Sequence, residues 1–446
     1  GSTATAIGIV RVSGIGCFAA CDRVFRPRNG VPFAQQPSHK MVFGEMLDDS
    51  GAAIDQGLAV RFGGGHSYTG EDSAEFHCHG SPVVLHTLLS ALFAAGARQA
   101  QAGEFTKRAF LNGKMDLTEA EAVIDLIDAQ SAAAAKNAAA QLDGGLRRRL
   151  EPVQEALIDI TSRFYAVVDY PDEDIEDIQP QQIRSSLQIA ADTLSALLDT
   201  AQRGRVLKNG VRTAIVGLPN AGKSSLLNAL LGYERAIVTE IPGTTRDTVE
   251  ERAELGGVTL RLIDTAGLRE TDDAVERIGV ERSRAALAGA ALALLVLDGS
   301  ASLTPEDEAA MAQAARAPRV ICLINKSDRP LAFAPEELRS RFPHLCVVSA
   351  ATGAGLDALG ETVAALFPAG GAESAGELLT NARQADAARR ALEAVTRASE
   401  SLEAGITPDA LLTDAEEALA ALGELTGASV REDVTARIFE RFCVGK

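Results

Sequence analysis

The spacing of apolar side chains separates residues 1 to about 115 from the rest of the chain. Short β-like runs cover residues 7–12, 57–62 and 73–78. Between and after them, residues 83–95 carry apolar side chains at helical spacing, which predicts one helix. Strands mixed with a helix favour an α+β domain for this part of the chain.

From Leu117 onwards the apolar spacing becomes helical. Thr118–Glu121 reads as a capping box, in which a hydroxyl and a carboxylate satisfy the free N–H groups of a helix start. An alanine-rich helical stretch continues towards Leu150, and a second long helix is expected after Pro152. A third helix is indicated by apolar residues on one face, namely Ile183, Leu187, Leu194 and Leu198.

Residues 211–367 repeat the order strand, turn and helix, which predicts a parallel sheet with crossover helices. Gly370-Gly371 reads as a linker. Helical spacing then resumes through Leu411, Ala415, Leu419, Leu422 and Leu425. The residues after the linker are too few to build a core alone. One helical domain made from both flanks, with the α/β unit inserted in it, solves this problem.

The expected fold is therefore multidomain α/β. Residues 1–115 form an N-terminal α+β domain, and residues 208–370 form an inserted Ras-like P-loop α/β domain. Residues 116–207 and 371–446 are the two parts of a discontinuous all-α helical domain.

Composition fits a large helical protein without a membrane span. Apolar residues make up 46% of the chain, but aromatic residues only 4%, so aliphatic side chains and alanine must fill the core. The most apolar stretch, residues 285–297, is followed by Asp298 and is shorter than the ~18 residues that a spanning helix needs. We expect a cytoplasmic protein that has no contact with a membrane.

The net charge of −18 argues against binding RNA by bulk electrostatic attraction. Any contact with RNA must use local basic clusters. Three clusters stand out, at Lys107-Arg108, at Arg147–Arg149 and at Arg203, Arg205 and Lys208. Each is equally compatible with a solvated face of a helix.

The cysteines and histidines give little support to a metal site. Cys17 and Cys21 are close in sequence, but no second close pair completes a zinc site. In a strand, His77 and His79 face one side and Cys78 the other, so structural roles are favoured over metal binding. Cys322 and Cys346 lie in apolar runs and are expected in the core.

Residues 217–224 fit the phosphate-binding loop pattern. They follow the apolar strand 213–216 and open a helix at residues 225–231, which is the required context. The glycines let backbone N–H groups surround phosphates, Lys223 reaches the β- and γ-phosphates, and Ser224 ligates Mg²⁺.

Downstream motifs complete a nucleotide site in the expected order. The strand 260–263 ends at Asp264–Gly267, where Asp264 can hold the Mg²⁺ shell and Gly267 N–H can meet the γ-phosphate. The loop Gly243–Asp247 between these motifs supplies hydroxyls that can complete the Mg²⁺ shell.

The base pocket predicts guanine. After the strand 320–324 comes Asn325–Asp328, whose Asp328 carboxylate can accept both the N1–H and the 2-amino group of guanine. Adenine lacks both donors and would leave a buried Asp328 unpaired, which discriminates strongly against ATP. Ser349-Ala350 completes the pocket, so GTP is expected.

The catalytic details differ from those of Ras-type GTPases. Those proteins place a glutamine directly after Asp-x-x-Gly to orient the attacking water, whereas this chain has Leu268. The acidic segment 270–276 can offer a carboxylate instead, and Asn220 can help hold a monovalent cation beside the phosphates.

Taken together, the motifs resemble one family, the tRNA-modification GTPases called MnmE or TrmE. The resemblance covers essentially the whole chain. It rests on Ser67–Asp72, His77–Gly80, Gly103–Thr106, Phe110–Lys114, Asp264–Arg269, Val275–Gly279 and the terminal Cys443–Lys446.

The resemblance implies an N-terminal domain that binds folate and forms a homodimer. It also implies a flavin-dependent partner protein that carries FAD. Together the two proteins install a carboxymethylaminomethyl-type group on C5 of the wobble uridine of tRNA. The one-carbon donor is a tetrahydrofolate derivative such as 5,10-methylene-tetrahydrofolate, with 5-formyl-tetrahydrofolate as an analogue.

The resemblance also assigns site residues. K⁺ is bound by Asn220, Thr239, Ile241 and Thr244, Mg²⁺ by Ser224 and Thr245, and Glu276 orients the water. Folate is bound by Arg11, Glu75, Lys114 and Lys446. The motifs and the resemblance together give the GTP-binding set, namely Asn220, Ala221, Gly222, Lys223, Ser224, Ser225, Thr239, Thr244, Thr245, Asp264, Thr265, Ala266, Gly267, Asn325, Lys326, Asp328, Ser349, Ala350 and Ala351.

Two questions stay open at the level of sequence. Cys443 is either a catalytic thiol of the modification chemistry or a packing residue, and we count it with Glu276 among the catalytic candidates. The alternative function is a regulatory or assembly GTPase of the ribosome-biogenesis type that shares only the nucleotide-binding domain.

Overall fold

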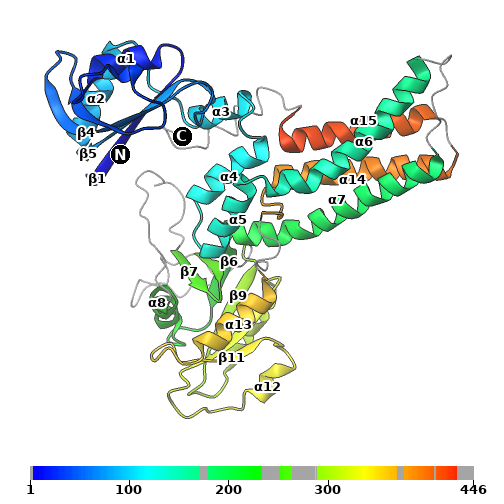
Figure 1. The fold of residues 1–446 in the computed structure, drawn as a ribbon. Coiled ribbons are helices and arrows are strands. Elements are labelled where there is room, and N and C mark those ends of the chain that lie inside the picture. The colour runs from blue at the N-terminus through cyan, green and yellow to red at the C-terminus, as the bar shows by residue number, and fades with distance from the viewer. Residues whose placement is uncertain are drawn as a thin grey trace. The chain divides into compact units, whose positions relative to one another are not determined.

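The computed structural model describes residues 4–169, 179–233, 251–263, 287, 289–368, 376–405 and 408–428. The chain divides into two compact units (Figure 1). The N-terminal unit comprises residues 1–124 and 423–446, and the second unit comprises residues 125–422.

The N-terminal unit is built on a five-stranded antiparallel sheet. Its strand order is β1 (Thr5–Ser13), β5 (Ser73–Gly80), β4 (Ala53–Phe62), β3 (Val42–Leu47) and β2 (Phe25–Pro27). The three strands predicted from the sequence correspond to β1, β4 and β5. Strands β2 and β3 were missed, since β2 is short and Gly44 and Glu45 interrupt the apolar pattern of β3.

Helices α1 (Cys17–Val24) and α2 (Pro82–Ala94) pack on one face of this sheet. The core between them includes Phe25, Phe33 and Phe76, whose ring centroids lie 5.7 to 5.9 Å apart. The opposite face of the sheet keeps apolar side chains in solvent, namely Ile7, Ile9, Phe43 and Leu58.

Helix α4 (Leu117–Ile127) follows α3 (Glu104–Leu111), and its start differs from the predicted one. The capping box uses Asp116, not Thr118. Asp116 Oδ1 accepts the Glu119 backbone N–H at 2.8 Å, and Glu119 Oε2 accepts the Asp116 N–H at 2.8 Å. Thr118 donates its hydroxyl to Asp116 Oδ1. Aspartate caps helices as well as threonine does, so the pattern alone allowed both starts.

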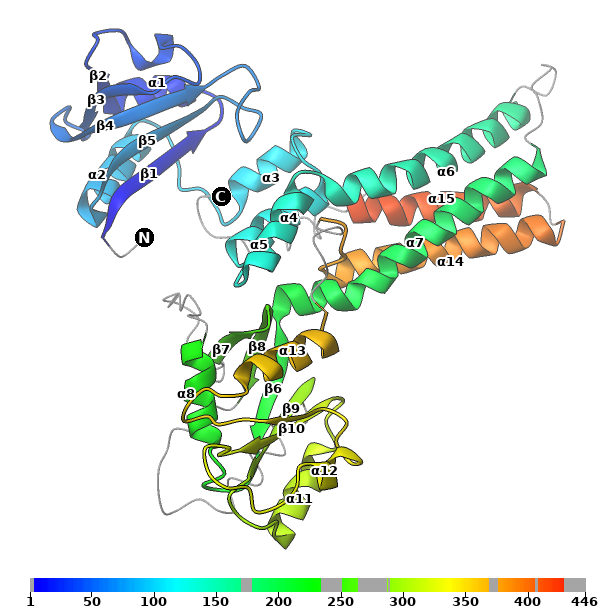
Figure 2. The same cartoon turned by 60° about the horizontal axis from the view of Figure 1, so that its bottom comes forward.

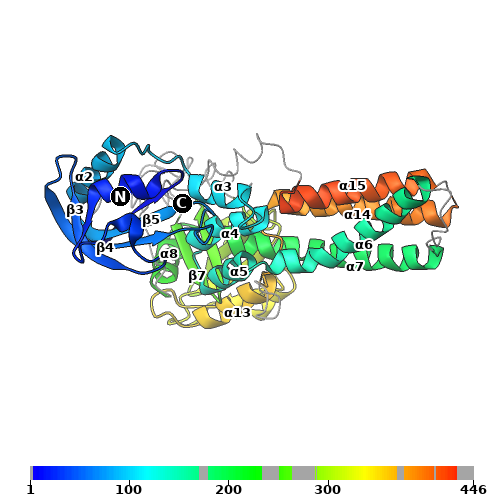
Figure 3. The same ribbon diagram turned by 45° about the horizontal axis from the view of Figure 1, so that its top comes forward.

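The helical domain draws on both flanks of the inserted domain, as predicted. It contains α5 (Ala132–Leu142), α6 (Gly145–Asp169), α7 (Pro180–Asn209), α14 (Ala382–Glu403) and α15 (Pro408–Thr426). Figures 2 and 3 show the four longer helices running side by side. Arg397 of α14 pairs with Asp414 of α15 at 3.0 Å, so charged side chains also link neighbouring helices.

Pro152 does not separate two helices, contrary to the prediction. It lies inside α6, which begins at Gly145. A proline inside a helix removes one backbone hydrogen bond and costs ~3 kcal/mol. Leu150, Val153 and Leu157 around it are almost completely buried, and burial of each such side chain contributes about 1.5–3 kcal/mol. The apolar stripe therefore carries the helix through the proline.

The inserted domain is a six-stranded sheet in the second unit. Its strand order is β11 (Leu345–Val347), β10 (Val320–Asn325), β9 (Leu292–Asp298), β6 (Val211–Val216), β8 (Val258–Ile263) and β7 (Glu251–Leu255). All neighbours are parallel except β7 and β8, an antiparallel edge pair that was not predicted.

In the described residues, the inserted domain has helices α8 (Lys223–Tyr233), α11 (Pro305–Ala314), α12 (Glu336–Arg339) and α13 (Leu356–Leu366) (Figure 2). Apolar cores lie on both faces of the sheet. This explains why β9 reads as a continuous apolar run. Cys322 and Cys346 are buried in these cores, as predicted.

In the described part of the chain, no helix combines the length and the apolar character that crossing a membrane requires.

Candidate functional site

The phosphate-binding loop connects β6 to α8 at the carboxyl end of the sheet. Its backbone is unusual at Gly217, Asn220 and Gly222, which have φ angles of 148°, 62° and 99°. A Cβ atom at Gly222 would overlap the side-chain amide of Asn325. The loop shape therefore depends on glycine at this position.

Lys223 begins α8 and turns back over the loop. Its Nζ donates to the Leu218 carbonyl oxygen at 2.7 Å, and burial lowers the pKa of the ammonium group. Ser224 and Ser225 follow in the first turn of α8. The predicted phosphate and Mg²⁺ side chains therefore share the loop and the amino-terminal turn of one helix, where backbone dipoles favour anions.

Asn325 joins the phosphate-binding loop to the predicted base pocket. It is buried, and its Nδ2 donates to the Ala221 carbonyl oxygen at 2.9 Å. Its Oδ1 accepts the Ala350 backbone N–H, also at 2.9 Å. The sequence predicted Asn325 in the nucleotide site. The structure adds that this side chain, at the end of β10, links the phosphate-binding loop to the loop that contains Ala350.

Asp328 and Ser349 meet at the same edge of the sheet. The hydroxyl of Ser349, which is fully buried, donates to Asp328 Oδ1 at 2.6 Å and lowers the pKa of this carboxyl group. Asp328 itself is exposed, whereas we expected it to be buried, because it lies in the loop beyond the end of β10. Its charge is thus fixed by a buried hydroxyl, and its outer edge is available for hydrogen bonds.

Lys326 has a partner that the sequence did not suggest. Its Nζ lies 2.6 Å from Oδ2 of Asp298, the last residue of β9. This contact lowers the pKa of Asp298, whose carboxylate also accepts the Ser300 hydroxyl. A charged residue that ends a continuous apolar run was the signal that could have identified Asp298.

The remaining predicted residues of this site lie outside the described residues. They are Thr239, Ile241, Thr244, Thr245, Asp264, Thr265, Ala266, Gly267 and Glu276. The same holds for Cys443 and Lys446 of the C-terminal motif. Ala351 is described and directly follows Ala350 in the loop after β11.

A second cluster lies in the N-terminal unit, around the predicted folate residues Arg11 and Glu75. These residues face each other on β1 and β5, and Arg11 Nη2 lies 2.7 Å from Glu75 Oε1. The Arg11 guanidinium also lies over the rings of Tyr68 and Phe105, at 5.5 and 5.6 Å from their centroids. An ion pair and two aromatic rings therefore meet at the Arg11 guanidinium.

Lys114 contacts the loop of residues 65–70, which also contacts Arg11. Its Nζ donates to the Gly65 carbonyl oxygen at 2.9 Å, and Asn112 Nδ2 donates to the Thr69 carbonyl oxygen at 2.7 Å. Tyr68 belongs to the same loop and contacts Arg11. The structure therefore gathers Arg11, Glu75 and Lys114 around one loop, although they are far apart in sequence.

The N-terminal unit also contains a network of ion pairs that the sequence did not predict. Glu104 accepts hydrogen bonds from Arg98 and Arg108, and Arg108 Nη1 also reaches Glu71 Oε2 at 2.8 Å. The hydrogen bonds from Arg98, from the Gln101 backbone N–H and from Arg108 together lower the pKa of Glu104 to about 2. The sequence signal for this network is the acidic Glu104 with basic residues on both sides of it, at Arg98 and Arg108.

His77, Cys78 and His79 alternate as predicted. Cys78 is buried in the core below the sheet, whereas His77 and His79 point to the other face, towards Glu75 and Asp55. Within the residues that the structure describes, no group of three or more histidine, cysteine, aspartate or glutamate residues could hold a metal ion.

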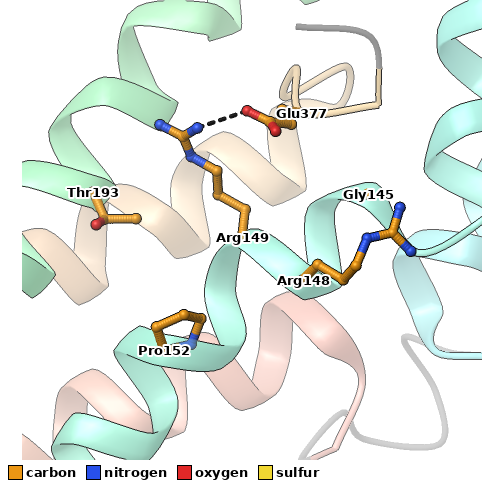
Figure 4. Close-up of a pocket in the computed structure, with 6 residues that line it drawn as sticks. All are labelled: Gly145, Arg148, Arg149, Pro152, Thr193 and Glu377. Carbon is orange, nitrogen blue, oxygen red and sulfur yellow. Dashed lines mark hydrogen bonds and ion pairs between the residues drawn. The ribbon is translucent and has the colours of Figure 1, made fainter.

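The basic cluster Arg147–Arg149 borders a pocket of about 390 Å³ between α6, α7 and the segment around Glu377 (Figure 4). Arg149 Nη1 lies 2.6 Å from Glu377 Oε2, and Arg148 pairs with Asp143 at 3.6 Å. The other clusters also contain paired cations, since Arg108 binds Glu71 and Lys208 binds Asp125. Structural ion pairing therefore accounts for part of each cluster.

Comparison with protein families places the whole chain in one group. Residues 1–114 match the model described as the GTP-binding protein TrmE N-terminus, and residues 117–443 match the MnmE helical domain model.

Curated relatives support the same assignment. The tRNA modification GTPase MnmE of Symbiobacterium thermophilum is 44% identical over 99% of this chain and 96% of its own length. The proteins of the same name from Roseiflexus sp. and Chloroflexus aurantiacus are 45% and 46% identical, with the same coverage.

Among solved structures, the G domain of the T. maritima FeoB iron transporter is 29% identical over 34% of this chain and 96% of its own length. Its TM-score is 0.26, so the assignment of the fold rests on the sheet topology described above.

The alternative of a regulatory GTPase that shares only the nucleotide-binding domain is wrong, because the matches include the N-terminal and helical parts. The fold is a TrmE-type N-terminal domain, a discontinuous helical domain and an inserted Ras-like P-loop domain. The chain belongs to the MnmE family of tRNA modification GTPases, which hydrolyse GTP in the modification of tRNA.

Proposed function

We propose that this chain is a K⁺-dependent GTPase that modifies C5 of the wobble uridine of tRNA together with a flavin-dependent partner. The added group is of the carboxymethylaminomethyl type, and a tetrahydrofolate derivative supplies its one-carbon unit. The protein acts in the cytoplasm as a homodimer formed through residues 1–115.

The observation that carries this proposal is the presence of two distinct polar sites in one chain. The inserted domain has a phosphate-binding loop joined to a carboxylate pocket through Asn325. The N-terminal unit gathers Arg11, Glu75 and Lys114 around residues 65–70. A GTPase that acts alone needs only the first site.

The nucleotide part of the proposal gives each described residue a task. Backbone N–H groups of residues 220–225 and the Lys223 ammonium group hold the phosphates. Ser224 and Thr245 hold Mg²⁺. Asp264 supports the Mg²⁺ shell, and the Gly267 N–H contacts the γ-phosphate. Asp328 accepts two guanine donors, with Lys326, Ser349, Ala350 and Ala351 around the base.

The cation part rests on Asn220. This residue adopts a left-handed backbone conformation in the phosphate-binding loop and is exposed. A side-chain amide oxygen is a suitable ligand for K⁺, and backbone groups of Thr239, Ile241 and Thr244 would complete the coordination. A cation there stabilises negative charge that develops during phosphoryl transfer. Glu276 orients the attacking water, since Leu268 cannot.

The folate part rests on Glu75 and its neighbours. Arg11 pairs with the Glu75 carboxylate, and a carboxylate can accept the paired N–H donors of a pterin edge. Lys114 is exposed and suits the negative glutamate tail of folate, as does the terminal Lys446. Cys443 would take part in the modification reaction itself.

The folate assignment is tested by calorimetry of the full-length protein with 5-formyl-tetrahydrofolate. We expect binding that weakens by on the order of 10- to 100-fold in Glu75→Ala, because a charge-assisted bidentate contact is lost. The exposed pair Arg26–Glu45 lies on the same sheet, so Glu45→Ala serves as the control. Absence of binding by the wild-type protein would remove the folate assignment.

The cation assignment is tested by GTP hydrolysis in K⁺ and in Na⁺. We expect fast hydrolysis in K⁺ and slow hydrolysis in Na⁺, since the smaller ion fits the same ligands poorly. Glu276→Ala should lose most of the rate and keep its affinity for GTP, because the carboxylate acts on the transition state. Equal rates in the two salts would contradict the role of K⁺. An arginine side chain would then have to stabilise the charge that develops on the phosphates, and Arg246 and Arg269 are the candidates.

A further inference from the structure

The chain passes between the helical domain and the inserted domain at two neighbouring points. On the outgoing side, α7 ends at Asn209 and β6 begins at Val211. On the returning side, residues 376–381 lead into α14 at Ala382. Any movement of the inserted domain relative to the helices must act on these two crossings.

One carboxylate, that of Asp125 on α4, holds both crossings. Its Oδ1 lies 2.7 Å from Nζ of Lys208, which is in the last turn of α7. Its Oδ2 accepts the hydroxyl of Thr380, in the returning segment, at 3.0 Å. The side chain of Asp125 is only 7% exposed, and Lys208 Nζ also donates to Asn381 Oδ1.

The returning segment has further polar attachments to the helices. Thr200 Oγ1 of α7 accepts the Leu379 backbone N–H at 3.0 Å, and Asn137 Oδ1 of α5 accepts the Gly376 N–H at 2.9 Å. Arg149 of α6 holds Glu377 (Figure 4). Side chains of α4, α5, α6 and α7 therefore hold residues 376–381. Asp125 contacts both crossings, and Lys208 of the outgoing crossing also contacts Asn381 directly.

The outgoing crossing is tightly packed against the inserted domain. Gly210 has a φ of 69°, and a Cβ atom there would lie 2.6 Å from the Thr259 carbonyl oxygen of β8. Strand β8 runs beside β6 and ends at Ile263, directly before the predicted γ-phosphate segment at Asp264. Both strands that start at this junction thus lead to the nucleotide site.

We propose that Asp125 is a positioning residue that couples the nucleotide state of the inserted domain to the tRNA modification reaction. A carboxylate this deeply buried is stable as an anion only while its cation and hydrogen-bond donors stay in place. Shifts of β6 and β8 that move Lys208 are therefore passed to α4 and to residues 376–381. Residues 117–124 of α4 belong to the N-terminal unit, so the same helix continues into that unit.

The test compares Asp125→Asn with a matched control in the full-length protein. We expect the kcat and KM of GTP hydrolysis to stay within about 2-fold of wild type, because Asp125 contacts Lys208 before the start of β6, whereas the phosphate-binding loop follows the end of β6. Formation of the modified wobble nucleoside in a complementing strain should fall by ~10-fold, a usual size for coupling between two sites. Asp159→Asn, which breaks the exposed pair Arg163–Asp159 on α6, should leave both quantities unchanged.

Hydrogen exchange distinguishes a role of Asp125 in coupling to the nucleotide state from a role in stabilising the fold alone. In the wild-type protein, the backbone amides of residues 376–381 should exchange at different rates with GDP and with a non-hydrolysable GTP analogue. Asp125→Asn should lose this difference, and Lys208→Arg, which keeps the charge, should retain it. Where Asp125→Asn fails to fold, Thr380→Val provides the same comparison through the loss of a single hydrogen bond.

Two results would overturn the proposal. One is that folded Asp125→Asn or Thr380→Val protein forms the modified nucleoside at the wild-type level and keeps the difference in amide exchange between the GDP and GTP-analogue states. The other is a parallel loss of GTP hydrolysis and of modification, which would mean that Asp125 only stabilises the fold. Neither result depends on K⁺ or on folate, so the outcome is independent of those assignments.

Discussion

The two sheets of this chain build their sites in different ways. In the mostly parallel sheet of the inserted domain, site residues lie at or just beyond the end of a buried strand, as Asp298 does at the end of β9 and Asp328 does after β10. In the antiparallel N-terminal sheet, the site forms where strands lie side by side, as Arg11 and Glu75 do through the register of β1 and β5. The first kind of site is local in sequence, and the second exists only once the strands pair.

The two sites should also differ in how well they tolerate amino-acid substitutions. The nucleotide site depends on backbone shape in the phosphate-binding loop, which no neighbouring side chain can replace. The N-terminal site depends on charge pairs, whose loss leaves the sheet and its aromatic core in place. We therefore expect substitutions in the first site to have larger effects than substitutions in the second.

The largest effect is expected for Gly222→Ala. The new Cβ would overlap the Asn325 amide, and the φ of 99° is unfavourable for alanine. Both the loop and its bridge to the base pocket are disturbed, so GTP affinity should fall by on the order of 100-fold. Titration with a fluorescent GTP analogue measures this loss.

Gly232→Ala is the matched control for this prediction. Gly232 lies in α8 of the same domain, and a Cβ there meets nothing within 4 Å. Alanine favours a helix by about 1 kcal/mol over glycine, so affinity should be retained and stability slightly raised. Equal affinities for GTP in the two variants would show that the loop tolerates a side chain.

A smaller effect is expected for Asp328→Asn. The amide replaces one acceptor by a donor, so GTP should bind about 10- to 100-fold more weakly, while xanthosine triphosphate, which has an acceptor at position 2, should bind better. Competition between the two nucleotides gives the ratio directly. A variant that still prefers GTP would mean that the base lies elsewhere.

The smallest effect is expected in the N-terminal unit, for Glu104→Gln. The pKa of Glu104 is lowered from 4.5 to about 2. Its ion pairs therefore stabilise the fold above the unfolded-state pKa and lose this effect as the pH falls towards about 2. Near pH 7 the substitution should cost about 1 kcal/mol, since solvent screens the exposed Arg98.

Urea denaturation followed by near-ultraviolet signals of the aromatic core measures this cost at several pH values. The difference between Glu104→Gln and wild type should be constant above the unfolded-state pKa of 4.5 and shrink as the pH falls from there to about 2. A difference that stays constant over that fall in pH would show that packing, and not charge, is responsible.

The sequence was informative where the chemistry is local. Loop 217–224, Asn325 and Asp328 were predicted because each motif directly follows a buried strand, and such strands appear as continuous apolar runs. The contacts within the N-terminal site could not be derived in this way, because the facing of Arg11 and Glu75 is set by strand register over a separation of 64 residues. Only the family resemblance pointed to these two residues.

Helix boundaries failed where two local rules competed. Asp116 and Thr118 were both suitable caps, and hydrogen bonds with Glu119 decided between them. Pro152 suggested a helix start, but the buried side chains on either side of it kept α6 continuous. The ion pair of Asp125 with Lys208 joins helices that are far apart in the chain, so nothing in the local pattern indicated it.

Nucleoside analysis of tRNA tests the central claim most directly, namely that GTP turnover in the inserted domain serves modification of the wobble uridine. The strains compared carry Gly222→Ala or Gly232→Ala as their only copy of this protein, at equal protein levels. We predict that the modified wobble uridine is missing with Gly222→Ala and present at the wild-type amount with Gly232→Ala. A wild-type amount of the modified nucleoside with Gly222→Ala, in a protein that no longer binds GTP, would contradict the account.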